Sequence, residues 1–71
     1  MGKATYEIVE PLGVLSTLRS GYTKEVNMIS WNGGVPRLDI RTWSPDHEPA
    51  RGVVLNGIEE VELKEILEKR G

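Results

Sequence analysis

The sequence contains no cysteine and only one histidine, His47. The missing cysteines exclude disulfide bonds and zinc sites built on thiolates. With one histidine, a transition-metal site would depend almost wholly on carboxylates, so we expect no metal and no other cofactor. A domain of 71 residues buries only a modest core. Because neither disulfides nor a metal supports that core, we expect a second copy of the chain to do so and predict a homodimer.

Long apolar runs are also missing. Nothing approaches the ~20 apolar residues that a membrane helix requires, and the N-terminus has no apolar signal stretch. Hydrophobic residues make up 38% and charged residues 28%, which is a globular rather than a disordered composition. No linker or internal repeat interrupts the chain. We therefore predict one domain over residues 1–71, located in the cytoplasm and without a membrane partner.

Turn signals divide the chain into four β-rich segments and a terminal helix. Asn32-Gly33 supplies the positive φ angles of a tight hairpin turn, and Ser44 to Pro49 is dense in turn formers. Pro11 and Gly13 interrupt the first segment, which indicates a bulge or bend within that strand. The predicted strands are 6–17, 22–31, 36–43 and 51–55. This order predicts an α+β fold with a four-stranded antiparallel meander and a C-terminal helix.

The helix after the last strand has apolar residues in two directions. Asn56 is the expected N-cap, and Glu59 three positions later completes a capping box. Leu63, Ile66 and Leu67 form a seam at i, i+3 and i+4. Two other apolar residues in the first turns point elsewhere. One helix with two apolar directions indicates two partners, its own sheet and a second subunit, so we predict the seam at the dimer interface.

The segment from Arg37 to Trp43 separates its residues strictly by alternation. Because side chains along a strand point alternately to the two sheet faces, this segment presents two faces of different character. The expected core face carries Leu38, Ile40 and Thr42. The expected open face carries Arg37, Asp39, Arg41 and Trp43. On the preceding strand, Asn27 and Trp31 also share one face, and a hairpin brings Trp31 beside the arginines.

An open face of this kind suits single-stranded nucleic acid. Arginine pairs with phosphate in a bidentate manner and stays charged. Exposed tryptophan offers a plane on which an unpaired base stacks, whereas the bases of a duplex are already stacked. Arg51 and Lys24 extend the predicted phosphate contacts. The net charge of −2 does not oppose this, because residues 1–56 are neutral overall and the acidic excess lies in residues 57–71.

Simpler interpretations of the same residues stay open. An alternating Arg/Asp face also occurs as a solvated sheet surface with cross-strand ion pairs. It also suits a protein-interaction module that binds an acidic peptide. Asp46 and His47 lie in a proline-flanked loop, and the chain shows no nucleophile motif or second histidine. We therefore expect no enzyme activity.

Residues 31–55 read WNGGVPRLDIRTWSPDHEPARGVVL. This stretch resembles the positive-cofactor-four family of transcriptional coactivators, and most closely its bacterial YdbC-like branch. The family has an aromatic-turn-basic segment, a DIR-x-W strand, a loop, and a basic-Gly strand before a helix. The matching residues here are Trp31, Arg37, Leu38 to Arg41, Trp43 and Arg51 to Leu55. Ile29 departs from the pattern, since eukaryotic relatives tend to have a basic residue there.

The resemblance implies a strongly curved sheet and a homodimer built largely through the helices. It implies binding of single-stranded DNA, and of RNA as a further ligand, with little sequence preference and a use in transcription, replication or repair. By the same resemblance, Trp31 and Trp43 would stack on bases and Arg37, Arg41 and Arg51 would contact phosphates. Lys24 and Asn27 complete the predicted set.

Overall fold

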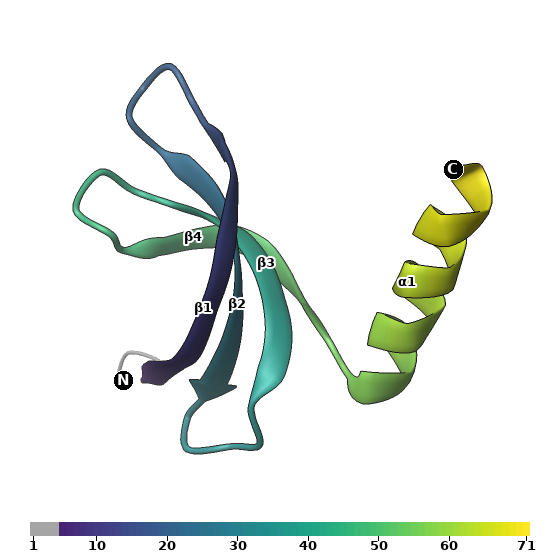
Figure 1. The fold of residues 1–71 in the computed structure, drawn as a ribbon. Helices are drawn as coiled ribbons and strands as arrows, with labels where there is room; N and C mark the ends of the chain where they lie inside the picture. Colours follow the sequence, from purple (N-terminus) through teal and green to yellow (C-terminus); the bar gives the residue numbers. More distant parts are fainter. Residues whose placement is uncertain (1–4) are drawn as a thin grey trace.

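The computed structural model describes residues 5–71 and shows four strands followed by one helix (Figure 1). The elements are β1 (Tyr6–Thr17), β2 (Thr23–Trp31), β3 (Arg37–Trp43), β4 (Pro49–Leu55) and α1 (Gly57–Arg70). Successive strands pair antiparallel in the order β1-β2-β3-β4, which confirms the predicted α+β meander. β4 begins earlier than predicted, at a proline that suits the first position of a strand. No helix within residues 5–71 is long and apolar enough to cross a membrane.

The predicted irregularity of β1 is confirmed. Its pairing with β2 shifts register three times, between Ile8 and Glu10, between Pro11 and Gly13, and between Val14 and Ser16. Each such irregularity bends a strand and increases its twist. β1 is also an edge strand, and bulges with a proline discourage further strands from pairing there.

The sheet curls so strongly that residues from opposite ends of its strands meet. Trp31 ends β2 beside Tyr6, whereas Trp43 ends β3 beside the start of β2. Tyr6 nevertheless contacts both tryptophans, with ring centroids 5.3 Å from Trp31 and 5.6 Å from Trp43. The face that carries these three rings is therefore the concave one, and we call it the inner face.

Burial reverses the predicted roles of the two sheet faces. Asp39 and Trp43, which alternation assigned to the open face, are fully buried. Leu38, Ile40 and Thr42, the expected core residues, are only half-buried. The alternation itself is correct, but the prediction of which side is covered was wrong. The reason is the curl, which folds the inner face upon itself while the opposite, outer face stays open.

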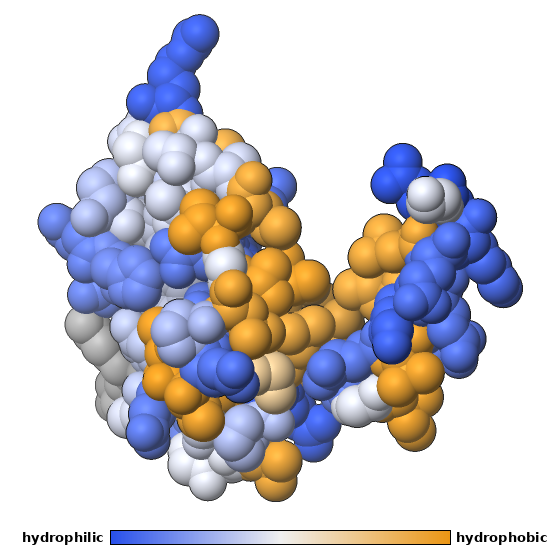
Figure 2. Space-filling model, viewed as in Figure 1, coloured by the Kyte–Doolittle hydropathy of each residue, from blue (hydrophilic) through white to orange (hydrophobic). Residues whose placement is uncertain are grey.

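The outer face and α1 enclose an apolar groove of about 600 Å³. Apolar surface covers the sheet and the side of α1 that faces it, with a hollow between them (Figure 2). The predicted capping box is present, since the side chains of Asn56 and Glu59 each accept the other's backbone N–H at 2.9 Å. None of the residues of α1 is buried. The helix is thus well formed locally but lacks a complete packing partner among residues 5–71.

The predicted helix seam divides between two directions. Leu63 and Leu67 line the groove opposite Leu38, and Val61 joins them there. Ile66 lies outside the groove and is 57% exposed. The apolar side of α1 that faces the sheet is thus made by Val61, Leu63 and Leu67. The dimer interface predicted for Leu63, Ile66 and Leu67 stays a prediction.

Gly52 offers a test of the close packing between β3 and β4. A Cβ added at Gly52 would lie 2.0 Å from the Cβ of Arg41 and 2.6 Å from the carbonyl oxygen of Ile40. We expect Gly52→Ala to lower the free energy of unfolding by about 1–3 kcal/mol or more, because such contacts force the strands apart. Gly13→Ala is the matched control, since a Cβ at Gly13 meets nothing within 4 Å. Urea unfolding followed by circular dichroism measures both, and equal midpoints would contradict the prediction.

Candidate nucleic-acid interface

Four aromatic rings form a continuous row on the inner face. Its members are Trp31 at the end of β2, Tyr6 at the start of β1, Trp43 at the end of β3, and His47 in the loop before β4. Tyr6 touches both tryptophans, and the imidazole of His47 stacks on Trp43 with centroids 4.4 Å apart and planes 11° apart. We call these four residues the aromatic row. They come from three strands and a loop, so only the curl of the sheet brings them together.

Trp31 is half-buried and held from two sides. Its Nε1 donates a hydrogen bond to Oδ2 of Asp39 at 3.1 Å. The guanidinium carbon of Arg41 lies 4.6 Å from the centre of the indole ring, which is within the range of a cation–π interaction. Both contacts fix the plane of the indole, and a fixed plane is what a stacking surface for a base requires.

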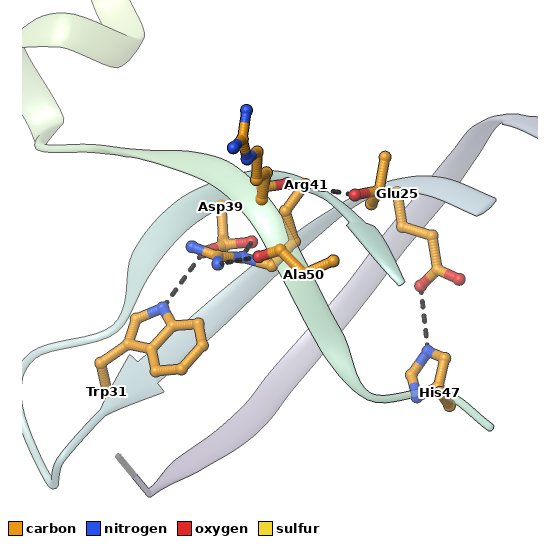
Figure 3. A network of polar contacts seen from close by, with 8 residues as sticks. Glu25, Trp31, Asp39, Arg41, His47 and Ala50 are labelled. Carbon is orange, nitrogen blue, oxygen red and sulfur yellow. Dashed lines mark hydrogen bonds and ion pairs between the residues drawn. The ribbon is translucent and has the colours of Figure 1, made fainter. Parts of the chain in front are cut away.

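Asp39 and Arg41 form a bidentate ion pair beside Trp31 (Figure 3). Nε of Arg41 donates to Oδ1 of Asp39 and Nη2 donates to Oδ2, each at 2.7 Å. Nη1 of Arg41 donates to the carbonyl of Ala50 on β4 at 3.0 Å. The Asp39 side chain is fully buried and that of Arg41 is 13% exposed. Three of the five N–H donors of the guanidinium are thus engaged, and Arg41 mainly positions its neighbours.

Trp43 is not the exposed platform that its strand position predicted. The side chain is fully buried, with His47 over one ring face and Tyr6 against its edge at an interplanar angle of 60°. Its Nε1 has no hydrogen-bond partner among the described residues. Asn27, another predicted contact residue, is also buried on the inner face, at 2% exposure. The curl of the sheet accounts for both, because it closes over the centre of the inner face.

His47 is tied to the sheet through Glu25 of β2. Nε2 of His47 lies 3.2 Å from Oε1 of Glu25, and the hydroxyl of Thr23 donates to Oε2 of Glu25 at 2.6 Å. Burial favours the neutral form of Glu25, but the hydrogen bonds from Thr23 and His47 and the charge of His47 outweigh it. The pKa of the Glu25 carboxyl therefore lies below its ordinary value.

The predicted cationic residues lie on both faces of the sheet. Arg37 shares its strand alternation with Asp39 and is exposed. Lys24 pairs with Thr42 and so belongs to the outer face, where Lys24 and Arg51 line a groove of about 360 Å³. Within residues 5–71, none of these three cations forms an ion pair. Two separate groups of cations thus replace the single predicted patch.

Sequence reasoning missed Tyr6 and His47 as members of the aromatic row. Tyr6 stands alone at the start of its strand, and its pairing with Trp31 depends on a register that local sequence does not reveal. His47 lies in a turn-rich loop where a polar residue is ordinary. Within residues 5–71, no cluster of three or more His, Asp or Glu side chains could hold a metal ion.

The buried ion pair predicts a strong effect of a nearly isosteric substitution. We expect Asp39→Asn to lower the free energy of unfolding by about 3–5 kcal/mol, because it leaves the guanidinium of Arg41 largely enclosed and without its counter-charge. Asp46→Asn is the matched control, since Asp46 is exposed. Thermal and urea unfolding measure both variants. A midpoint for Asp39→Asn equal to that of the control would show that the ion pair contributes little to the fold.

No protein-family model matches the chain. Over 63 residues it is 43% identical to an uncharacterized protein of Treponema pallidum (strain Nichols), and the match covers 87% of this chain and 74% of that protein. At this identity and coverage the two share one family. The chain therefore belongs to the family of that Treponema pallidum protein.

Proposed function

We propose that the protein binds single-stranded DNA, and also RNA, with little sequence preference and without catalysis, as a member of the YdbC-like branch of the positive-cofactor-four family. The aromatic row is the observation that carries the proposal. Of its members, Tyr6 is 37% exposed and Trp31 is half-buried. Fixed and partly exposed rings in a line offer successive bases a stacking surface.

The form of this surface favours unpaired bases over duplex. Stacking on an aromatic ring is worth roughly 1–3 kcal/mol per base and does not depend on the base, because every base has a flat π face. In a duplex those faces are already covered by neighbouring bases. The preference for single strands follows from the covered base faces of the duplex. The low sequence preference follows because every base has a flat π face.

Phosphate contacts would come from cations on both faces of the sheet. Arg37 is exposed on the inner-face alternation, and Lys24 and Arg51 lie together on the outer face. β4 is one of the two edge strands, so Arg51 borders an edge of the sheet, whereas Arg37 and Lys24 lie on β3 and β2. The two unengaged donors of Arg41 are a further contact near Trp31.

We also propose that the apolar groove is covered by a second copy of the chain. The groove walls are half-exposed in a single chain, with Leu67 at 50% and Val61 at 54% exposure. Its rim carries charges of both signs, Glu60, Lys64 and Glu68, so like charges do not oppose self-association. A domain this small gains most from burying such a surface in a symmetric pair.

Titration with fluorescein-labelled oligo-dT tests the nucleic-acid proposal. We expect binding that weakens as salt rises, because phosphate contacts release counterions. We expect Tyr6→Ala and Trp31→Ala each to weaken binding about tenfold or more, equivalent to roughly 1–3 kcal/mol. Tyr22→Ala is the matched control, since Tyr22 has the same 37% exposure as Tyr6 but lies outside the aromatic row.

Fluorescence anisotropy at low salt gives the dissociation constants. Binding of a polyglutamate peptide in place of oligo-dT and oligo-U would favour the acidic-peptide module and overturn the proposal. If Tyr6→Ala and Tyr22→Ala lowered the affinity for oligo-dT equally, the aromatic row would not be the stacking surface.

Analytical ultracentrifugation tests the dimer. We expect the parent chain to sediment as a dimer and the Leu63→Glu/Leu67→Glu variant as a monomer, because carboxylates in the apolar groove would lose their hydration on association. Val35→Glu is the control for adding a charge at an exposed aliphatic position, since Val35 is 71% exposed and lies outside the groove. A monomeric parent chain at micromolar concentration would refute this part of the proposal.

A further inference from the structure

The half-exposed side chain of His47 covers one ring face of Trp43. The indole is fully buried, yet the group above it is the His47 imidazole, whose side chain is 52% exposed. The two rings lie 4.4 Å apart and nearly parallel, at 11°. This is the geometry that a nucleobase adopts on an aromatic side chain. The imidazole therefore occupies the place of a stacked base.

The loop that carries His47 is closed by its own hydrogen bonds. The backbone N–H of Ser44 donates to the carbonyl of Glu48 at 2.9 Å, and the N–H of His47 donates to the carbonyl of Ser44 at 2.8 Å. His47 itself has φ of 60°, in the left-handed region that histidine and asparagine tolerate better than most residues. The loop thus keeps its shape without the imidazole, whose own contacts to the sheet are the stack on Trp43 and the contact with Glu25.

We propose that His47 is a removable cover over the ring face of Trp43, which is the face on which a base would stack. An incoming base displaces the imidazole and stacks on the indole in its place. The inference rests on the proposed binding of single-stranded nucleic acid. It restores to Trp43 the stacking role predicted from sequence, but only in the open state of the cover.

We expect the cover to depend on pH and to close more tightly as pH falls. The charged groups near His47 are Glu25 from β2 and the adjacent loop residues Asp46 and Glu48, all acidic, while Trp43 supplies an uncharged ring. A protonated imidazole pairs with the carboxylate of Glu25, whose Oε1 lies 3.2 Å from Nε2 of His47. Glu25 favours its ionised form, because its pKa lies below the ordinary value. Protonation therefore strengthens the ion pair and the stack, and the cover closes as pH falls.

Acrylamide quenching tests the cover without any nucleic acid. Trp31→Phe is introduced in every chain, so that Trp43 is the only tryptophan and its fluorescence is measured alone. His47→Asn keeps a residue that accepts the left-handed backbone but removes the ring, whereas His47→Phe keeps a ring without charge. We expect the quenching constant of Trp43 to rise at least twofold in His47→Asn and to stay near the parent value in His47→Phe. Equal quenching in His47→Asn and the parent would overturn the cover.

The same chains are compared at pH 8.0 and pH 5.5. We expect quenching of Trp43 in the parent to fall at pH 5.5, and we expect no such change in His47→Phe or Glu25→Gln. Circular dichroism at both pH values checks that each chain stays folded. A parent whose quenching does not change with pH would overturn the proposed control by protonation.

Oligo-dT binding to chains that retain Trp31 tests the base site. We expect the parent to bind oligo-dT severalfold more weakly at pH 5.5 than at pH 8.0. Acidification by itself makes the protein more positive and would strengthen phosphate contacts, so this expected direction is the opposite of the general charge effect. We expect His47→Asn to bind more tightly than the parent at pH 5.5. Weaker binding by His47→Asn than by the parent would make His47 a direct contact and overturn displacement. If no chain binds oligo-dT while quenching behaves as expected, the cover stands and the nucleic-acid proposal fails.

Discussion

The ion pair between Asp39 and Arg41 is the interaction on which the rest of the inner face depends. A carboxylate buried as fully as Asp39 is tolerated only when it is paired and hydrogen-bonded. Arg41 supplies the opposite charge, and Trp31 donates to the same carboxylate from the end of β2. Arg41 also reaches the carbonyl of Ala50 on β4. One pair on β3 thus connects three strands and fixes the plane of the indole.

The core and the proposed binding surface are made from the same residues. A 71-residue chain with one sheet and one helix has no separate interior to support a site. The curl of the sheet packs Tyr6, Trp31 and Trp43 against one another, and the parts of these rings that stay exposed form the surface. Rigidity of the row is therefore a consequence of packing, and loss of packing removes the surface as well.

The two faces of the sheet invert the usual arrangement of a small domain. The inner face is rich in polar and aromatic groups that contact one another, whereas the outer face and α1 leave an apolar groove open. In a single chain this groove exposes surface that water disfavours. The proposed second copy removes that surface, and it does so without covering the aromatic row, which lies on the other side of the sheet.

The strands, turns and helix caps were predictable because their causes are local. Asn32 and Gly33 adopt the positive φ angles that their types favour, and Asn56 with Glu59 forms the capping box their spacing requires. Strict alternation likewise determined that Asp39, Arg41 and Trp43 share one face. Alternation did not determine the side to which the sheet curls. That side decides the burial of Trp43 and the half-exposure of Leu38.

What the sequence by itself determined is therefore the set of elements and the membership of each strand face. The tertiary structure alone decided which face closes, that Asp39 takes the guanidinium of Arg41, and that Tyr6 and His47 join the two tryptophans. The physical reason is the range of the interactions. Backbone preference and alternation act over a few residues, whereas the curl sums the register shifts of β1 and the contacts between residues far apart in the chain.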